Sequence, residues 1–213
     1  IFQLLRKSYD IDFSFYKRST VTRRVYRRLL MSQITDLDEY VERLRSDAYE
    51  LNQLYKDLLI GVTKFFRDPE AFERLEHDVL PQLLARIGAH EELRVWVAGC
   101  ATGEEAYSIA ILAHELCEQL ARPINVKIFA TDVHRASLTA ASAGVYNEAS
   151  LSEVTPQRLK RYFIRGQGGY QVAPELRQLI VFAPHNIVKD APFTKVDLIT
   201  CRNLLIYLDP LAQ

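Results

Sequence analysis

The sequence predicts an α/β protein in which a parallel sheet is preceded by a small all-helical domain. Residues 1 to about 90 carry apolar side chains at helical spacing, with no strand-like run among them. After residue 90, short apolar runs alternate with helical stretches, as in strands that are joined by helices over a parallel sheet. With 213 residues and 48% hydrophobic content, the chain can bury one sizeable core or two small ones.

The composition limits the classes of protein to which the chain can belong. Formal net charge is zero, so attraction to nucleic acid or to acidic protein requires a local cluster of charge. No apolar run approaches the ~18 residues of a membrane span, and the N-terminus lacks a signal-peptide pattern. Cys100, Cys117 and Cys201 show no C-x-x-C spacing, which favours a reducing compartment and argues against structural zinc. We therefore expect a cytoplasmic protein without a bound metal ion.

The first long helix, expected at 17–30, has an apolar face and a basic face. Val21, Val25 and Leu29 recur every four residues and predict the buried face. The basic face carries Lys17, Arg23, Arg24, Arg27 and Arg28. It is either a solvated surface, paired with nearby acids such as Asp10, Asp12 and Glu42, or a docking surface for an acidic helical partner or a nucleic-acid backbone. Aromatic residues do not interleave with these arginines, which argues against stacking on single-stranded nucleic acid.

Two more helices and a connecting helix complete the first half. Thr35 with Asp38 predicts one helix start, and a break near Ser46 and Asp47 separates that helix from the next one. After Gly61 the helical pattern stops. Asp68, with Pro69 at the first helical position, then predicts a cap and a connecting helix. This division gives a helical domain at 1–66, a linker helix at 67–90 and an α/β domain at 91–213.

The short segment 61–68 combines two apolar with two polar side chains of interest. Phe65 and Phe66 are expected to anchor it in a core, whereas Thr63 and Arg67 are placed to face a cleft between the domains.

A turn with two glycines, Gly99 and Gly103, separates an expected strand at 93–98 from a helix that starts at Glu104 and ends at Arg122–Pro123. The spacing is G-x-x-x-G and lacks the G-x-G-x-x-G that fits a pyrophosphate. Glu104 and Glu105 would also repel a phosphate at this helix start. The turn therefore favours a nucleoside with positive charge, such as S-adenosylmethionine (SAM). A capping box between Thr102 and Glu105 is compatible with that ligand.

Further strands are expected at 126–132, 179–183 and 196–200. Asp132 ends the first of these at the sheet edge where ligands lie, and its carboxylate can accept both hydroxyls of a ribose. The alternative is that Asp132 caps a helix at 135–143. Between about 145 and 179 the alternation is interrupted by a short helix and by a hairpin at 165–172, which predicts a small inserted β subdomain. His185 has no partner at metal-ligand spacing, so we expect a loop or packing role for it.

Four motifs together resemble the bacterial chemotaxis receptor methyltransferases of the CheR family. They are T-K-F-F-R at 63–67, A-T-G-E-E-A-Y-S at 101–108, F-A-T-D at 129–132 and C-R-N-L-L-I-Y at 201–207. The resemblance covers almost the whole chain. It implies a doubly wound, Rossmann-like SAM-methyltransferase sheet and transfer of a methyl group from SAM to glutamate side chains of chemoreceptors, with S-adenosylhomocysteine (SAH) as an inhibitory product.

The resemblance also implies roles for individual residues. Arg67 and Tyr207 would position the substrate carboxylate, and the basic helix would meet the acidic helical bundle of a chemoreceptor through Arg23, Arg24, Arg27 and Arg28. The cofactor would be held by Thr63, Arg67, Gly99, Glu105, Asp132, Asn186, Ile187, Asn203 and Leu204. At the start of this set, Gly61 stands where relatives carry Asn.

Two departures from the family pattern shape further expectations. The terminal antiparallel strands of the family lie beyond residue 213, so we expect the chain to be cut from a longer protein, as a monomer or as part of a multidomain chain. The insert at 166–172 is shorter than in members that grip a receptor's C-terminal pentapeptide, which indicates a methyltransferase that needs no such tether. The rival hypotheses are a SAM- or SAH-sensing regulatory module and a nucleic-acid methyltransferase. The second lacks the Pro-Pro-aromatic motif after Asn203 that methylation of a base amine calls for.

Overall fold

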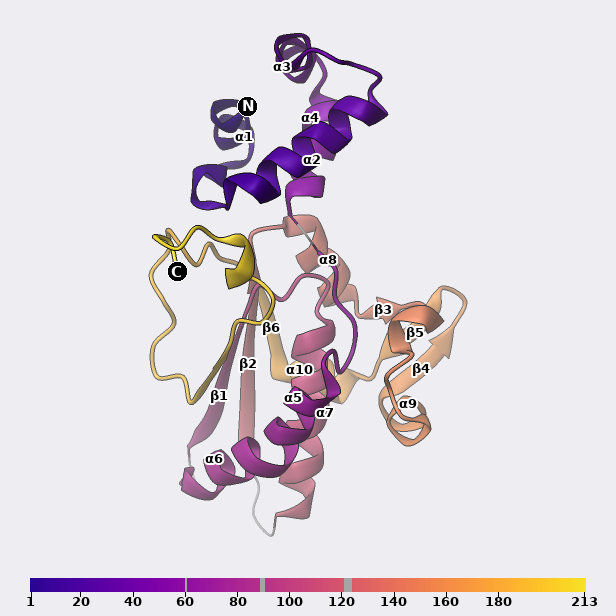
Figure 1. Cartoon of the computed structure of the whole chain (residues 1–213). Helices are drawn as coiled ribbons and strands as arrows, with labels where there is room; N and C mark the ends of the chain where they lie inside the picture. Colours follow the sequence, from indigo (N-terminus) through magenta and orange to yellow (C-terminus); the bar gives the residue numbers. More distant parts are fainter. Residues whose placement is uncertain (60, 89–90, 121–123) are drawn as a thin grey trace. The chain divides into compact units, whose positions relative to one another are not determined.

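A computed structural model describes residues 1–59, 61–88, 91–120 and 124–213 (Figure 1). The chain divides into a helical unit, Ile1–Ile60 with Asn203–Gln213, and an α/β unit, Gly61–Arg202. Residues 61–66 thus belong with the α/β unit instead of the expected helical domain 1–66, and the last eleven residues belong with the helices. The expected helix end at Arg122–Pro123 and residues 89–90 of the expected linker lie outside the described residues.

Four α-helices form the helical unit: α1 (Phe2–Tyr9), α2 (Arg18–Met31), α3 (Leu37–Ser46) and α4 (Ala48–Leu58). A short 3-10 helix, Phe13–Phe15, precedes α2. Val21, Val25 and Leu29 are buried on α2, which confirms the predicted apolar face. They belong with other buried apolar side chains of this unit, among them Leu5, Phe13, Tyr40, Leu44 and Leu54.

Aspartates begin two of these helices. Asp36, not the expected pair Thr35 and Asp38, is the N-cap of α3, and its carboxylate accepts the Glu39 N–H at 2.9 Å. Asp47 ends α3 and caps α4, accepting the N–H groups of Tyr49 and Glu50 at 3.0 and 3.1 Å. A short aspartate side chain satisfies N–H groups that have no partner within the helix, which explains why the chain turns sharply here.

The C-terminal segment pairs with the start of the helical unit. Leu205–Tyr207 form a 3-10 helix, and the Tyr207 carbonyl accepts the Lys17 N–H at 2.9 Å. Tyr16 and Leu208 form an antiparallel bridge, and the Asp209 N–H donates to the Phe15 carbonyl at 2.7 Å. These main-chain bonds fix the segment that carries the last sequence motif against the start of α2.

The α/β unit contains a parallel four-stranded sheet in the order β6-β2-β1-β7. Its strands are β1 (Glu92–Ala98), β2 (Asn125–Asp132), β6 (Ile180–Pro184) and β7 (Leu198–Thr200), the last shorter than the expected 196–200. Counted along the chain, the order is 3-2-1-4, the first part of the doubly wound arrangement, and its direction reverses between β1 and β7. Ligands of such sheets bind at the carboxyl ends of the strands near this reversal.

Helices α7 (Glu104–Gln119), α8 (Arg135–Ala143) and α10 (Pro174–Leu179) pack on the sheet. The expected linker helix is part of the same core. It consists of α5 (Pro69–Arg74), a π turn (Leu75–Val79) and α6 (Leu80–Arg86). Phe72, Leu80 and Leu84 are buried in one cluster with the strands and α7, so this segment stabilises the sheet instead of spanning between domains.

The interruption between α8 and α10 is a small antiparallel sheet, as predicted. It consists of β3 (Val145–Tyr146), β4 (Phe163–Gly166) and β5 (Gly169–Val172) in the order β3-β5-β4, with a 3-10 helix at Glu148–Leu151 and α9 (Pro156–Tyr162). β4 and β5 form the predicted hairpin. Among the described residues, no helix is long and apolar enough to span a membrane.

Candidate functional site

The turn after β1 is held open by main-chain bonds and left-handed residues. Gly99, Ala101 and Gly103 have φ values of 74°, 46° and 95°. The N–H groups of Gly99 and Cys100 both donate to the Thr131 carbonyl on β2, at 2.8 and 2.9 Å. The left-handed region suits glycine and strains Ala101, so the conformation is imposed by these contacts. The turn is thereby fixed at the carboxyl edge of the sheet.

Gly103 is the residue that the packing around this turn requires. A Cβ at this position would lie 2.9 Å from the Ala141 Cβ and 3.1 Å from the Tyr146 hydroxyl oxygen. The Tyr146 hydroxyl donates to the Thr102 carbonyl at 2.6 Å, so the inserted subdomain contacts the turn directly. Only a residue without a side chain lets β3 and α8 approach the turn this closely.

Asp132 ends β2 and ties the turn to the next loop. Its Oδ2 accepts the Ala101 N–H at 2.9 Å, and its Oδ1 accepts the His134 N–H at 2.8 Å. His134 is the N-cap of α8, and no side chain caps that helix, so the alternative that Asp132 caps it is wrong. Each carboxylate oxygen retains further acceptor capacity toward a ligand.

Two buried glutamates occupy the first turn of α7. Burial raises the pKa of Glu104, and a hydrogen bond of 2.7 Å from the Thr102 hydroxyl opposes that rise. The predicted capping box is wrong, because Gly103 is the N-cap and Thr102 bonds to Glu104 instead of capping the helix. Burial also raises the pKa of Glu105, an effect opposed by the hydroxyl of Thr200 and by the charge of Arg202.

Glu105 has acceptor capacity that the described residues leave unused. Its Oε1 is buried and has no hydrogen bond of normal geometry among them, and the same holds for the Thr200 hydroxyl oxygen. Its Oε2 lies 3.5 Å from a guanidinium nitrogen of Arg202. A buried carboxylate oxygen that is left without a partner is costly and fits a site that a cationic or hydrogen-donating ligand completes.

The segment before α5 brings Arg67 to the start of α7. Phe65 is fully buried and packs edge-on against Tyr146 and Phe163 of the insert, as expected for a core anchor. The Phe66 N–H donates to the Ser108 hydroxyl on α7 at 3.0 Å. The Arg67 guanidinium donates to the Val62 carbonyl at 2.7 Å, and its charge is one of the smaller influences that oppose the rise in the pKa of Glu105.

Two family models match this chain consecutively. The one described as "CheR methyltransferase, all-alpha domain" matches residues 1–59, and "CheR methyltransferase, SAM binding domain" matches residues 61–213. The chain belongs to the CheR methyltransferase family. The two matches meet at residue 60, where the structure also divides, and they confirm the predicted family and its helical and α/β architecture.

Relatives among characterised and named proteins agree with this assignment. The chain is 32% identical to a chemotaxis protein methyltransferase of Listeria innocua and 35% identical to that of Escherichia coli, covering 76% and 74% of their lengths. It is also 45% identical over its whole length to an uncharacterized 104.1 kDa protein in the hypE 3′ region of Rhodobacter capsulatus, of which it spans 22%.

Most cofactor residues that the CheR resemblance implies belong to the α/β unit. Gly99, Asp132 and Asn186 with Ile187 follow the carboxyl ends of β1, β2 and β6, which the sheet brings to one edge. Glu105 begins α7 beside that edge, and Thr63 and Arg67 lie on the segment before α5. Asn186 is held in its loop, where its Oδ1 accepts the Val188 N–H at 3.0 Å. His185 packs edge-on against Trp96, in the packing role expected for it.

Asn203, Leu204 and Tyr207 belong to the helical unit. Asn203 directly follows Arg202 and has a left-handed φ of 56°. Tyr207 is the last residue of the 3-10 helix, and its carbonyl accepts the Lys17 N–H. Their roles at the cofactor and substrate remain predictions from the CheR resemblance.

The residues at this edge fit SAM, the cofactor named in the CheR domain match. The buried Glu105 carboxylate suits a cationic ligand, and Asp132 offers carboxylate oxygens at the position where the sheet binds a ribose. The described residues include no group of three or more His, Cys, Asp or Glu side chains that could hold a metal ion. Burial raises the pKa of the Cys100 thiol, which packs in the core.

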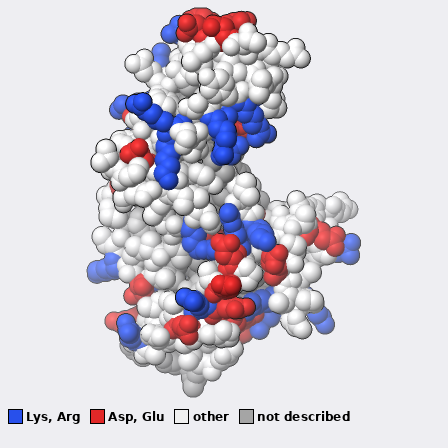
Figure 2. All heavy atoms as spheres, in the orientation of Figure 1, with Lys and Arg blue, Asp and Glu red and all other residues white. Residues whose placement is uncertain are grey.

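The basic face of α2 is only partly available to a partner. Figure 2 shows blue side chains gathered over the region where Figure 1 draws α2. Arg23 and Arg27 are exposed, and Arg24 is half-buried. Arg28, whose side chain is 11% exposed, instead donates to both carboxylate oxygens of Glu50 at 3.0 and 2.5 Å. Its pairing with Glu50 counts against the expectation that Arg28 contacts a partner. Of the acids expected near this face, Asp12 pairs with Arg6 and Glu42 pairs with Arg45.

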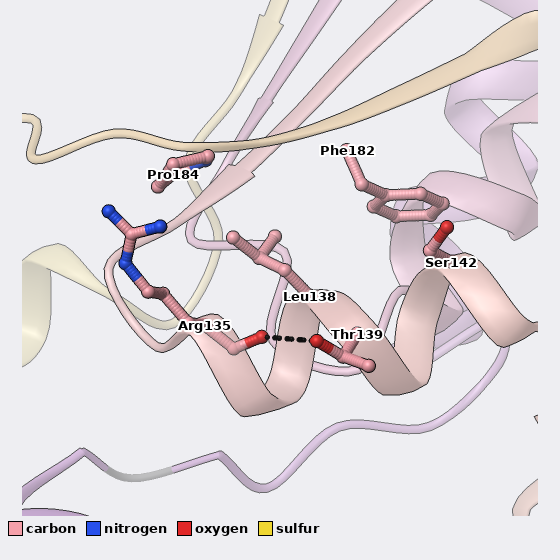
Figure 3. Close-up of a pocket in the computed structure, with 6 residues that line it drawn as sticks. All are labelled: Arg135, Leu138, Thr139, Ser142, Phe182 and Pro184. Carbon is pink, nitrogen blue, oxygen red and sulfur yellow. Dashed lines mark hydrogen bonds between the residues drawn. The ribbon is translucent and has the colours of Figure 1, made fainter.

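A pocket of about 360 Å³ lies elsewhere on the α/β unit, between α8 and β6 (Figure 3). Arg135, Leu138, Thr139, Ser142, Phe182 and Pro184 line it. Figure 3 shows the Thr139 hydroxyl bonded to the Arg135 carbonyl within α8. None of these residues is among the predicted cofactor residues, so this pocket does not define the cofactor site.

Sequence reasoning missed four residues near the site. Tyr146 contacts the turn after β1, and Thr200 influences Glu105. Ser108 and Arg202 contact the segment around Arg67. Ser108 and Arg202 lie inside the motifs and received no role. Their positions just after a helix start and just after a strand are the only local signals, because their partners are distant in sequence.

Proposed function

We propose that this chain catalyses SAM-dependent methylation of glutamate side-chain carboxylates on chemoreceptors, as a protein-glutamate O-methyltransferase. The observation that carries the proposal is the buried Glu105 carboxylate with an unused oxygen, beside the glycine turn at the carboxyl edge of a 3-2-1-4 sheet. Membership of the CheR family and relatives named chemotaxis protein methyltransferase support the substrate class.

The residues divide the work between cofactor and substrate. In this proposal Thr63, Arg67, Gly99, Glu105, Asp132, Asn186, Ile187, Asn203 and Leu204 hold SAM. When bound, SAM supplies a methyl group on a sulfonium, an electrophile that needs no metal. Arg67 and the Tyr207 hydroxyl orient the incoming carboxylate. Asp132 and the turn from Gly99 to Gly103 fix the position of the cofactor.

The reaction needs alignment rather than proton transfer. A glutamate side chain has a reference pKa of about 4.3, so it is already an anionic nucleophile at neutral pH and requires no general base. The chain then has to hold the carboxylate oxygen in line with the methyl carbon and to exclude water. Such alignment corresponds to effective molarities of order 10⁵ M or more in favourable cases.

The docking surface comprises Arg23, Arg24 and Arg27, without Arg28. Arg23 and Arg27 lie on the face of α2 opposite its buried residues, and the half-buried Arg24 lies at the side of that face. Their charge complements an acidic helical bundle. The hairpin of the insert is short, with two residues between β4 and β5, and this supports methylation without a C-terminal pentapeptide tether. The proposal also retains a cytoplasmic location for the enzyme.

The test separates binding from chemistry. Calorimetric titration of the wild-type chain with SAM and SAH should show binding of both, with SAH the tighter ligand. A chemoreceptor signalling fragment and labelled SAM then measure methyl transfer, in a protein extended to the full length of the family. Arg67→Ala and Tyr207→Phe should reduce the rate at least tenfold. Absence of binding by both ligands, or wild-type rates for both variants, would refute the assignment.

A second candidate function is a SAM- or SAH-binding regulatory module within a larger signalling protein. It is favoured by the 104.1 kDa relative, of which this chain matches 22%. Binding of SAM without turnover on any chemoreceptor fragment, in the extended protein, would favour this function over catalysis.

A further inference from the structure

Arg202, just beyond β7, joins three segments around Arg67. One of its guanidinium nitrogens donates to the Arg67 carbonyl at 2.5 Å and to the Asp68 carboxylate at 2.8 Å. The other lies 3.5 Å from the Glu105 carboxylate, and the guanidinium carbon lies 4.9 Å from the Phe72 ring centre. A planar guanidinium with several fixed donors can satisfy such an arrangement, whereas an ammonium group cannot hold all of it at once.

The backbone that Arg202 holds is strained on both sides of Arg67. Phe66 and Asp68, neither of them glycine, have left-handed φ values of 47° and 57°. Residues other than glycine keep this conformation only when surrounding contacts impose it, and such strain concentrates at functional sites. The strained pair sets the direction in which the Arg67 side chain leaves the backbone.

Two contacts impose this conformation, one on each side. The Ser108 hydroxyl accepts the Phe66 N–H at 3.0 Å, in a buried position on α7. Arg202 holds the Arg67 carbonyl and the Asp68 side chain on the other side. Asp68 is the N-cap of α5 but its side chain caps nothing, so the carboxylate is committed to Arg202 instead of to the helix. The predicted N-cap position of Asp68, with Pro69 directly after it, is confirmed, but no cap bond from the Asp68 side chain is present.

We infer that Arg202 is a positioning residue that holds Arg67 in place for the cofactor and the substrate. The inference rests on the proposed function for the role of Arg67. Arg202 acts through the main chain of residues 66–68. Its guanidinium nitrogens contact the Arg67 carbonyl, the Asp68 carboxylate and the Glu105 carboxylate. Losing it frees the Arg67 segment from one of its two anchors.

The first measurement needs no cofactor. In the ligand-free protein, Arg202→Lys should increase hydrogen–deuterium exchange in peptides covering 61–68 by about tenfold, while peptides from β1 and β2 exchange as in the wild type. Arg165→Ala, which removes an exposed arginine from the insert, is the matched control and should change neither. Unchanged exchange at 61–68 in a folded Arg202→Lys variant would overturn the inference.

The second measurement asks whether Arg202 acts through Arg67. Calorimetry should show about tenfold weaker SAH binding for Arg202→Lys, but less than a twofold further change when the same substitution is made in an Arg67→Ala background. Fully additive losses would instead indicate direct contact between Arg202 and the ligand and would overturn the inference. If Arg202→Lys fails to fold, Asp68→Asn removes the charge that Arg202 grips and should raise exchange at 61–68 in the same way.

The two proposals fail separately. Wild-type protein that binds neither SAM nor SAH would refute the proposed function, while the exchange measurement would still report whether Arg202 anchors residues 61–68. Wild-type protein that binds SAH, together with an Arg202→Lys variant that matches it in exchange and affinity, would refute only the positioning role.

Discussion

At the scale of single residues, Glu105 shows a conflict between stability and binding. Burial raises the pKa of this carboxyl, so the folded ligand-free chain holds a proton on it more tightly than the unfolded chain does. The ionised side chain therefore lowers stability at a pH above the folded pKa, and this penalty shrinks as the pH falls through that value and is gone below the unfolded pKa. An ionised carboxylate kept at such a position favours a ligand that neutralises it.

We predict that Glu105→Gln stabilises the ligand-free chain and weakens SAM binding. At pH 7 the free energy of unfolding should rise, because the substitution removes a carboxylate whose ionised form is disfavoured by burial. SAM affinity should fall about tenfold by calorimetry. The stabilisation should shrink as the pH is lowered, since burial makes wild-type Glu105 take up a proton more readily than a glutamate of the unfolded chain does. Gln in place of the exposed Glu91 is the control, and destabilisation by Glu105→Gln at pH 7 would contradict the argument.

Glu50 is a buried glutamate with the opposite behaviour. Burial alone would raise its pKa, but hydrogen bonds from Arg28 and from the Tyr40 hydroxyl, at 2.8 Å for Tyr40, lower that pKa below its ordinary value. The ionised form therefore contributes stability above the unfolded pKa, and the contribution is lost as the pH falls through the folded value. The side chain is 4% exposed, so little solvent screens the pair.

We predict that Glu50→Ala destabilises the chain by about 3 kcal/mol at pH 7, because it leaves the Arg28 guanidinium in a buried position where Asp57, at 3.9 Å, is its remaining ion-pair partner among the described residues. Urea unfolding measures the loss, which should diminish below about pH 4. Glu42→Ala, which removes an exposed partner of Arg45, should change stability by less than about 0.5 kcal/mol. Equal effects of the two substitutions would contradict the assignment of Arg28 to the core.

At the scale of elements, the turn after β1 depends on close approach by two neighbours. We predict that Gly103→Ala lowers stability by about 1–3 kcal/mol, because the new Cβ would face both a strained φ of 95° and the Ala141 side chain at 2.9 Å. SAH binding should weaken with it. Gly168→Ala, in the hairpin of the insert, meets nothing within 4 Å and is the control. Thermal unfolding and calorimetry compare the two, and an unaffected Gly103→Ala variant would contradict the packing described.

At the scale of the whole molecule, the proposed docking residues of α2 and the glycine turn proposed for the cofactor belong to different units. We predict that Arg23→Ala combined with Arg27→Ala lowers kcat/KM for a chemoreceptor fragment about tenfold at low salt and leaves SAH affinity unchanged, because loss of charge slows association with an acidic surface. The difference should narrow as salt is added, since screening weakens the wild type more. Arg45→Ala on α3 is the control. An equal loss for the control would contradict a docking role for α2.

Local patterns could be predicted from the sequence, whereas contacts between distant residues could not. Periodicity identified α2, the strands and the insert, because burial of one face repeats locally along the chain. Thr35 and Asp36 are both good capping residues one position apart, and sequence does not choose between them. The predicted capping box at Thr102 is wrong because Gly103, in a left-handed conformation, is the N-cap of α7. Arg28 and Arg202 pair with residues 22 and 134 positions away, which only the folded chain reveals.

The base of the inserted β subdomain contacts the turn after β1, whereas the tip of its hairpin is open to solvent. At the base, the Tyr146 hydroxyl binds the Thr102 carbonyl, and a Cβ on Gly169 would lie 2.4 Å from the Tyr146 carbonyl oxygen. At the tip, Gly168 has no neighbour within 4 Å of an added Cβ. Extra residues added at the tip would therefore leave the turn after β1 undisturbed. The hairpin is thus a position where a longer, partner-specific segment can be inserted without changing the rest of the α/β unit.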